Sequence, residues 1–404
     1  MLGFSLLKEE PQYRIIFWSS VLNKMGGRFA QVGSFALLYL LTESGMALGI
    51  LMALLVLPTI ILAPLSGYLA DRFHKAKLLF WTDMIRMPFA LLPLWAASSE
   101  QLGLLYVSTF MVASGEAIYR PIRFAIIPDI VQKKNIAEIN GLEQNIVGIT
   151  LIFGSLMGGI IAFFVNTEVL FIFHGLFLSA AAIFVWRLMK TDKLVHHATK
   201  SSDNANVWLL IQVAILRSFV IVMLLMPLAN GVDNVIVNLI ALDVFDKGDL
   251  GVGIIYAALG VGFVLSSWIA QWLRGKYIAI GISMILLEGI GHLLLSQSVF
   301  FVQAVLIAIF ITFVGGISNI CFDSVLMRIL PASNRGFLFG ALSMLQNSSM
   351  GIAMIGAGFL MEWLSPLQGS LFIGVIYIFF TCIFLLVFNQ VNIRRSIRQL
   401  RQYG

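Results

Sequence analysis

The chain has 404 residues, of which 59% are apolar and only 11% are charged, and its mean hydropathy is +0.95. Soluble proteins carry about 25% charged residues, and no soluble core could hide this much apolar surface from water. A net charge of +6 would suit nucleic acid, but the placement of the basic residues decides what they mean. Composition therefore predicts an integral membrane protein.

Apolar runs long enough to cross a lipid bilayer recur along the whole chain. A transmembrane helix needs about 20 mostly apolar residues to cross roughly 30 Å of hydrocarbon. By this criterion we predict an all-α protein with twelve transmembrane helices. The predicted spans are residues 14–42, 47–70, 77–97, 103–131, 138–164, 168–189, 218–245, 250–273, 277–296, 298–330, 335–364 and 368–391.

The basic residues indicate how these spans are oriented. Short cytoplasmic loops retain Lys and Arg during membrane insertion, so an excess of these residues marks the cytoplasmic side. With the N-terminus inside, nineteen of the 26 Lys and Arg residues fall on the cytoplasmic side, and only Lys247 falls outside. We therefore expect a multi-pass protein of the bacterial plasma membrane with both termini in the cytoplasm.

Residues 207–245 are long enough to cross the membrane twice, which would give thirteen spans. A second crossing would place Lys276 and Arg335 outside, against the charge rule. We therefore interpret residues 207–217 as a helix that lies at the cytoplasmic interface, with Trp208 as its anchor.

Three weak sequence matches at similar offsets indicate an internal repeat. The matching segments lie 200 to 204 residues apart: ALGILMAL at 47–54 with GVGIIYAA at 251–258, GYLADR at 67–72 with SWIAQW at 267–272, and Pro128 with Gln144-Asn145 against Pro331 with Gln346-Asn347. Two halves of six spans each are typical of transporters. We predict a six-helix bundle over residues 1–190, a cytoplasmic linker with the interfacial helix over 191–217, and a second six-helix bundle with a basic tail over 218–404.

Motifs for catalysis or cofactor binding are missing from the sequence. It has no G-x-x-x-x-G-K-[ST] loop for ATP and no H-E-x-x-H or G-x-S-x-G motif. Cys321 and Cys382 lie in apolar runs, which argues against a disulfide framework or a Cys-based zinc cluster. No predicted loop has room for a soluble catalytic domain. We therefore expect no enzyme activity, no cofactor, no metal and no nucleic-acid partner.

The loop after the second span resembles a family signature. Its residues are Gly67-Tyr-Leu-Ala-Asp71-Arg72-Phe-His-Lys75-Ala-Lys77. This pattern is similar to the G-x-x-x-D-R-x-G-R-K signature of the major facilitator superfamily, although position 74 is His where the signature has Gly. A second stretch, GEAIYRPIRFAIIPDIV at 115–131 followed by Asn140-Gly-Leu, resembles the macrolide-efflux and enterobactin-exporter branch, and also lysophospholipid transporters.

The resemblance implies two six-helix bundles around a central cavity, lined mainly by spans 1, 4, 7 and 10, that opens alternately to either side. It also implies a conformational latch, in which Asp71 pairs with Arg123 or Arg120 near the end of span 4 and meets the start of span 11. The residues expected in this latch are Gly67, Asp71, Arg72, Lys75, Arg120 and Arg123. The alternative is a solvated basic loop that only fixes topology.

Charged side chains near the middle of a span need a partner, a water-filled cavity or a function, because each costs at least about 2.5 kcal/mol at the bilayer centre. Lys24, Arg28 and Gln31 share one face of the first span, which suits a cavity wall better than lipid. Glu116 of span 4 and Asp233 of span 7 lie at similar depth, so we expect them to supply the opposite charges.

Three further points concern these charges. Glu116 is alternatively held by Arg120, four residues on. Asn319 and Asp323 of span 10 are additional candidates for the cavity. The pair formed by Glu288 and His292 on span 9 is expected to serve packing, because the resemblance makes span 9 peripheral.

We hypothesise that Glu116 or Asp233 takes up a proton in one state of the cavity and releases it in the other. The alternative is a permanently ionised pair that joins helices without moving a proton. The sequence therefore predicts a monomeric secondary transporter, a proton antiporter that exports an amphiphilic small molecule such as a drug, a macrolide-like compound or a siderophore. A lysophospholipid flippase of the same fold and a non-transporting membrane sensor are the alternatives.

Overall fold

The computed structural model describes residues 5–42, 45–99, 101–189, 207–273, 275–331, 335–361 and 363–392, together with residues 396 and 400. Almost all of these residues are helical, and none of them lies in a strand. The predicted linker over residues 191–206 lies outside the described residues.

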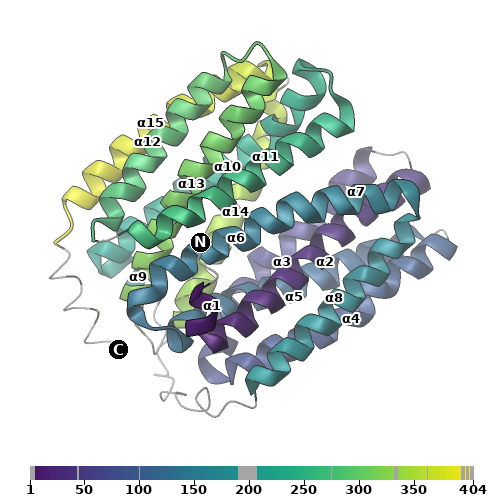
Figure 1. The fold of residues 1–404 in the computed structure, drawn as a ribbon, viewed down its shortest axis with the longest axis horizontal. Helices are drawn as coiled ribbons and strands as arrows, with labels where there is room; N and C mark the ends of the chain where they lie inside the picture. The colour runs from purple at the N-terminus through teal and green to yellow at the C-terminus, as the bar shows by residue number, and fades with distance from the viewer. Residues whose placement is uncertain are drawn as a thin grey trace.

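The first half of the chain forms six long helices that run alternately in opposite directions (Figure 1). A short helix, α1 (Leu6–Glu9), precedes them, and the fifth of the six consists of α6 and α7 joined through a π-helical turn at Thr150–Gly154. The helices are α2 (Pro11–Thr42), α3 (Gly45–Arg72), α4 (Lys75–Ser99), α5 (Leu102–Ile130), α6 (Ile136–Ile149), α7 (Ser155–Phe164) and α8 (Thr167–Met189).

The second half repeats this arrangement with six more long helices (Figure 1). These are α10 (Ala214–Leu239), extended by a π-helical turn at Ile240–Val244, and α11 (Gly248–Ile269), α12 (Tyr277–Leu295), α13 (Phe301–Ile329), α14 (Arg335–Met361) and α15 (Pro366–Asn389). Each of the twelve predicted spans coincides with one long helical segment, and the ends agree within four residues. The predicted all-α fold of two six-helix bundles is confirmed.

Among the described residues, nine helices are long and apolar enough to cross a membrane by length and composition alone. The long helices outside this set are α2, α3 and α4. In α2 and α4, charged side chains such as Lys24 and Asp83 interrupt the apolar sequence. Charge inside an otherwise apolar helix marks the part of the molecule where function is expected.

The entry into the second bundle differs from the sequence prediction. Instead of one interfacial helix over residues 207–217, the structure has only the single-turn helix α9 (Leu209–Gln212). The backbone is extended at Val213, and α10 begins at Ala214, four residues earlier than predicted. Leu209 is buried, while Trp208 is 63% exposed. Burial of the leucine against the bundle explains why the chain turns here instead of continuing along the interface.

The two bundles contact each other through α3 with α14 and through α6 with α11. We use the term proximal end for the end of the molecule where α2 begins and α8 ends. Near this end, α6 packs closely on the end of α11 and the turn that follows it, because a Cβ atom at Gly141 would lie 2.5 Å from Cβ of Ala270 and 3.1 Å from the carbonyl oxygen of Ser267. A Cβ atom at Gly148 would likewise collide with the carbonyl oxygen of Gly260. Small residues at these positions allow the bundles to close together.

Candidate functional site

Asp129 joins the two bundles at the proximal end. It lies in the last turn of α5, and its Oδ1 accepts a hydrogen bond from Nη1 of Arg335, the first residue of α14, at 2.6 Å. Its Oδ2 accepts a hydrogen bond from Nζ of Lys75, the first residue of α4, at 2.5 Å. One carboxylate is therefore shared between a cation of its own bundle and a cation of the opposite bundle. We call these three residues the Asp129 contact.

Each residue of the Asp129 contact has the wrong charge for its own helix end. A helix carries partial positive charge at its N-terminus and partial negative charge at its C-terminus. Asp129 is an acid at a C-terminus, while Lys75 and Arg335 are cations at N-termini. Such a placement costs about 0.3–1 kcal/mol for an isolated helix. The contact offsets these costs by bringing the three charges together, and the part of its stabilisation that comes from Arg335 exists only while the bundles are closed at this end.

Two hydrogen bonds add to the closure of the proximal end. Nδ2 of Asn140 on α6 donates to Oγ of Ser324 on α13 at 3.1 Å. Oγ of Ser267 on α11 donates to Oδ1 of Asn145 on α6 at 2.9 Å. Because all of these residues lie in the proximal halves of their helices, the structure has its bundles joined at that end.

The residues predicted for the latch are distributed differently in the structure. Lys75 takes part in the Asp129 contact, and the guanidinium of Arg72 lies 4.7 Å from the centroid of the Tyr68 ring. Arg123 forms a buried ion pair with Glu143 of α6. The side chain of Asp71 and the surroundings of Gly67 lie outside the described residues, so the role of Asp71 in a latch stays a prediction.

Sequence reasoning missed Asp129 and Arg335 as partners. Asp129 stood within the quoted stretch at 115–131, and Arg335 entered only the count of cytoplasmic bases. An available signal was the mismatch between their charges and the helix ends at which they were predicted to lie. The mismatch says that partners are needed, but not which ones.

His74, which replaces the glycine of the family signature, caps the next helix. It directly precedes α4, and the backbone N–H of Lys77 points to its Nδ1 at 3.4 Å. This is the position where a side-chain acceptor satisfies a free N–H group of the first helical turn. Partial burial, and then the nearby charge of Lys77, lower the pKa of His74 below its ordinary value of 6.5. A neutral imidazole is the form that can accept this hydrogen bond.

The carboxylate of Glu116 lies 3.3 Å from Nη2 of Arg86 on α4, so the ion pair joins α5 to α4. Nη1 of Arg86 also donates to Oδ1 of Asn23 on α2 at 3.1 Å, and Nδ2 of Asn23 donates to Oδ1 of Asp83 at 2.7 Å. Arg86 and Asp83 are almost completely buried, whereas the Glu116 side chain is 41% exposed. The pair therefore has one buried and one accessible partner.

The basic residues of α2 lie close to acids of the same bundle. Lys24 is near enough to Glu116 and Glu143 for its charge to be attracted by both. Nη1 of Arg28 donates to Oε1 of Gln31 at 3.0 Å. Gln31 also lines a small cavity of about 60 Å³ inside the first bundle. The charges of Lys24 and Glu116 attract each other, while their expected pairing in a cavity stays a prediction, and Arg28 and Gln31 lie on one face of α2.

Charges also face each other between the bundles. Arg120 on α5 and Asp323 on α13 are close enough for their charges to attract. Arg120 and Asn319, one turn before Asp323, are exposed even though they lie in the middle of long helices. These three residues form a polar boundary between the halves, on the helices that the sequence assigned to a cavity.

Asp233 lies elsewhere, so its expected position opposite Lys24 and Arg28 has to be corrected. Its Oδ1 is 3.8 Å from Nδ1 of His292 on α12. The physical reason is the rotation of α10 about its axis, which turns the side of the helix that carries Asn230 and Asp233 toward α15 and α12. Tyr377 of α15 contacts both helices. Its hydroxyl donates a hydrogen bond to Oδ1 of Asn230 at 2.6 Å, and its ring stacks on that of His292 with the ring centroids 5.3 Å apart.

The sequence assigned Glu288 and His292 to packing on a peripheral helix, and that role stays a prediction. Both are buried, with exposed fractions of 7% and 1%, and they lie one turn apart on α12. In the described part of the chain, Oε2 of Glu288 and Nε2 of His292 have no hydrogen-bond partner. We call Asp233, Glu288, His292 and Tyr377 the second-bundle cluster.

Comparison with known proteins agrees with this architecture. Residues 17–354 match the family model of the Major Facilitator Superfamily. A bacterial homologue of the iron transporter ferroportin in an outward-facing state has a TM-score of 0.71, with 16% identity, 93% coverage of this chain and 98% of that one.

Curated relatives have higher sequence identity to this chain, and two of the three match only part of it. YfiS of Bacillus subtilis (strain 168), an uncharacterised MFS-type transporter, is 23% identical over 90% of this chain and 88% of its own length. BacE of Bacillus amyloliquefaciens, whose name gives bacilysin export, is 28% identical over 126 residues, and the chain spans only 31% of its length. LplT of Pectobacterium carotovorum, a lysophospholipid transporter, is 27% identical over 26% of this chain and 24% of its own length.

The expected resemblance to the superfamily is thus confirmed, whereas its macrolide-efflux and enterobactin-exporter branch stays a prediction. Four features agree with this family: the motif after α3, the twelve long helical segments, the two bundles and the match over most of the chain. The chain belongs to the Major Facilitator Superfamily of membrane transporters.

Proposed function

We propose that this protein is a proton-coupled secondary transporter that exports an amphiphilic small molecule by alternating access. The observation that carries the proposal is the Asp129 contact, which joins α5 to α14 at the proximal end. We assign this end to the cytoplasm, because the charge rule places both chain termini there. The protein then stands as a monomer in the plasma membrane, closed toward the cytoplasm.

The strength of the Asp129 contact suits a gate that has to open. Its side chains are 33%, 19% and 12% exposed for Asp129, Lys75 and Arg335. Partly exposed ion pairs contribute about 0.2–1 kcal/mol each. A ligand that binds the other conformation preferentially by a few kcal/mol can therefore break the contact. A fully buried ion pair at the same place would hold the bundles shut.

We propose two positions at which a proton could be exchanged. Glu116 is accessible and paired with Arg86, and Asp233 lies beside His292 in the second-bundle cluster. Protonation of either carboxylate would remove its attraction to the partner on another helix. Uptake of a proton would thereby loosen the contact between α5 and α4, or between α10 and α12. This is the link between proton binding and helix movement that an antiporter needs.

The test uses everted membrane vesicles with an acidic interior, in which a proton-coupled exporter accumulates its substrate. Ethidium serves as a cationic amphiphilic probe, and uptake is compared for the wild type, Glu116→Gln, Asp233→Asn and the exposed control Glu168→Gln. We expect gradient-driven uptake that falls at least tenfold in one of the first two variants and is unchanged in the control. Equal uptake in all four proteins would contradict the proposed coupling of export to proton movement through Glu116 or Asp233.

The name of BacE supports export, and that of LplT supports a second candidate function, the movement of lysophospholipids across the membrane. Transfer of radiolabelled lysophosphatidylethanolamine into spheroplasts, measured beside ethidium efflux, distinguishes the two. Lysolipid transfer without dye efflux would identify the protein as a lipid transporter. Movement of neither probe by purified protein in liposomes would favour the non-transporting sensor.

A further inference from the structure

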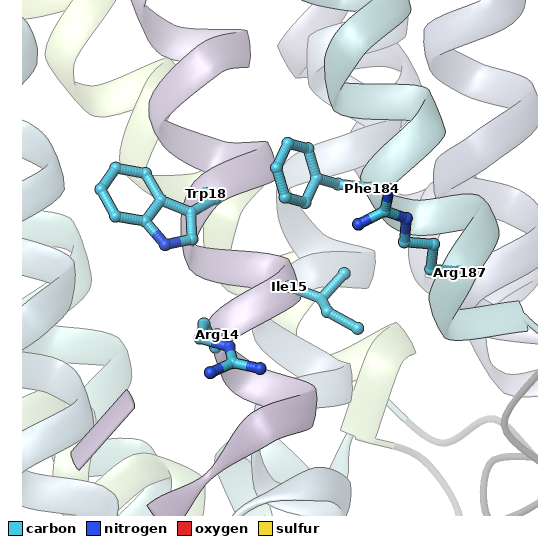
Figure 2. Close-up of a pocket in the computed structure, with 5 residues that line it drawn as sticks. All are labelled: Arg14, Ile15, Trp18, Phe184 and Arg187. Carbon is cyan, nitrogen blue, oxygen red and sulfur yellow. The ribbon is translucent and has the colours of Figure 1, made fainter. Parts of the chain in front are cut away.

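A groove lies between α2 and α8 at the proximal end of the first bundle. Its volume is about 460 Å³, and its lining residues are Arg14, Ile15, Trp18, Phe184 and Arg187. Figure 2 shows Ile15 and Phe184 between the two helices, the guanidinium of Arg187 beside Phe184, and Trp18 on the side of α2 that faces away from α8 in this view. None of the lining residues is an acid or belongs to the proposed transport site.

The lining residues occupy one face of each helix. Arg14 and Ile15 lie four and three positions before Trp18 on α2, and Phe184 and Arg187 are three positions apart on α8. Residues at such spacings lie on the same side of a helix. The groove is therefore part of the regular packing of α2 against α8, two helices in extensive contact.

Chemical character changes with depth along this groove. Arg14 is in the first turn of α2 and Arg187 in the last turn of α8, so both cations lie at the proximal end. Trp18 and Phe184 each lie about one turn farther into the membrane, next to Ile15. Both arginines are exposed, Trp18 is 43% exposed and Phe184 is half-buried. The guanidinium of Arg187 lies 5.9 Å from the centroid of the Phe184 ring, so the two cations at the proximal end lie next to partly exposed aromatic surface.

We propose that this groove binds an anionic phospholipid of the cytoplasmic leaflet. Its phosphate lies between the guanidinium groups of Arg14 and Arg187, which bind phosphate oxygens in pairs of hydrogen bonds. One acyl chain packs along Trp18, Ile15 and Phe184. Basic pockets between transmembrane helices on the cytoplasmic side are suited to anionic headgroups. Such a lipid bridges the first and the last helix of the bundle.

The charge of the groove selects the lipid class. A zwitterionic headgroup carries its own cation, which the two arginines repel, whereas an anionic headgroup neutralises both. The aromatic floor selects a molecule with a tail over inorganic phosphate, because each methylene group that packs against this apolar surface is removed from water. The site therefore requires both parts of an anionic amphiphile.

The experiment is native mass spectrometry of the purified full-length protein with added phosphatidylglycerol or phosphatidylcholine of identical acyl chains. The test variant is R14Q/R187Q, and the matched control is K133Q/K134Q, which removes two exposed lysines from the turn between α5 and α6. We expect phosphatidylglycerol to bind the wild type and the control equally, and to bind R14Q/R187Q about tenfold more weakly. Phosphatidylcholine should bind all three proteins equally weakly.

Three results would overturn the proposal: equal binding of both lipids to the wild type, undiminished phosphatidylglycerol binding by R14Q/R187Q, or complete displacement of the lipid by inorganic phosphate. A photoactivatable phosphatidylglycerol provides a readout on the wild type alone, which does not depend on the folding of a variant. It should label peptides that contain residues 14–18 and 184–187. Labelling confined to other peptides would equally reject the site.

Discussion

Asp129 Oδ1 and Arg335 Nη1 lie 2.6 Å apart, although 206 residues separate them in the chain. The two residues belong to different bundles and meet at helix ends that disfavour their charges individually. Their contact therefore depends on how the two halves of the protein are placed relative to each other.

Asp129→Asn should open the proximal end. The amide keeps the shape of the side chain but loses the charge that attracts Lys75 and Arg335. Spin labels at Lys133 and Lys276, in a variant without Cys321 and Cys382, would report the separation of the bundles. We expect a longer-distance population in Asp129→Asn and the wild-type distribution in Asp246→Asn, which removes an exposed acid at the other end. Identical distance distributions in both variants would exclude the Asp129 contact as a latch.

Gly148→Ala should open the same end by steric conflict. A Cβ atom at this position collides with the carbonyl oxygen of Gly260 and approaches Cγ2 of Val264 to 2.6 Å. Gly159→Ala is the matched control, because in the described part of the chain no atom beyond the neighbouring backbone of its own helix lies within 4 Å of its added Cβ. The spin-label distance should increase only in Gly148→Ala. If Gly159→Ala gave the same increase, contact between α6 and α11 would not explain the effect.

Glu143→Gln should destabilise the first bundle strongly. Glu143 pairs with Arg123 and accepts a hydrogen bond from the Tyr13 hydroxyl at 2.8 Å, all in the buried interior. Removing one partner of a buried ion pair costs about 3–5 kcal/mol, because the other charge is left without compensation. The melting temperature in detergent should fall well below that of the wild type. Glu168→Gln changes an exposed acid and should have the melting temperature of the wild type. An equally small decrease in Glu143→Gln and Glu168→Gln would contradict the prediction.

The stability of the protein should depend on pH through His74. Its pKa is below 6.5 in the folded state, so the unfolded chain binds a proton more readily. Stability from this residue is therefore complete above a pH of about 6.5 and is lost as the pH falls from there through the lower pKa of the folded state. His74→Asn keeps a capping acceptor that does not titrate. When the pH is lowered from 8 to 5, the melting temperature of the wild type should fall further than that of His74→Asn. An equal fall in both proteins would refute a role of His74 in the pH dependence of stability.

The positions of the spans could be predicted because they depend on local composition. A run of apolar residues is stable in the bilayer whatever surrounds it, so counting such runs located all twelve long helices within a few residues. The prediction was less accurate for the short helix before α10, because the point at which that helix ends depends on the burial of Leu209 against the bundle.

The partners of charged side chains were predicted less well, for a different reason. Depth along a span follows from counting residues, and Lys24 and Glu116, which counting placed in the same part of the membrane, lie close enough for their charges to attract. The rotation of a helix about its axis does not follow from counting, and it turns Asp233 toward His292. A turn of about 100° per residue means that a small change in rotation exchanges one set of neighbours for another.

The amino-acid sequence by itself therefore determined the class of this protein, the number of its helices, the family to which its loop motif belongs and the orientation that its basic residues favour. Only the tertiary structure decided that Asp129 meets Arg335, that His74 caps α4 and that two arginines share one groove. The first set depends on the free energy of each segment in lipid or water, which is a local property. The second depends on helix rotation and on packing between segments that are distant in the chain.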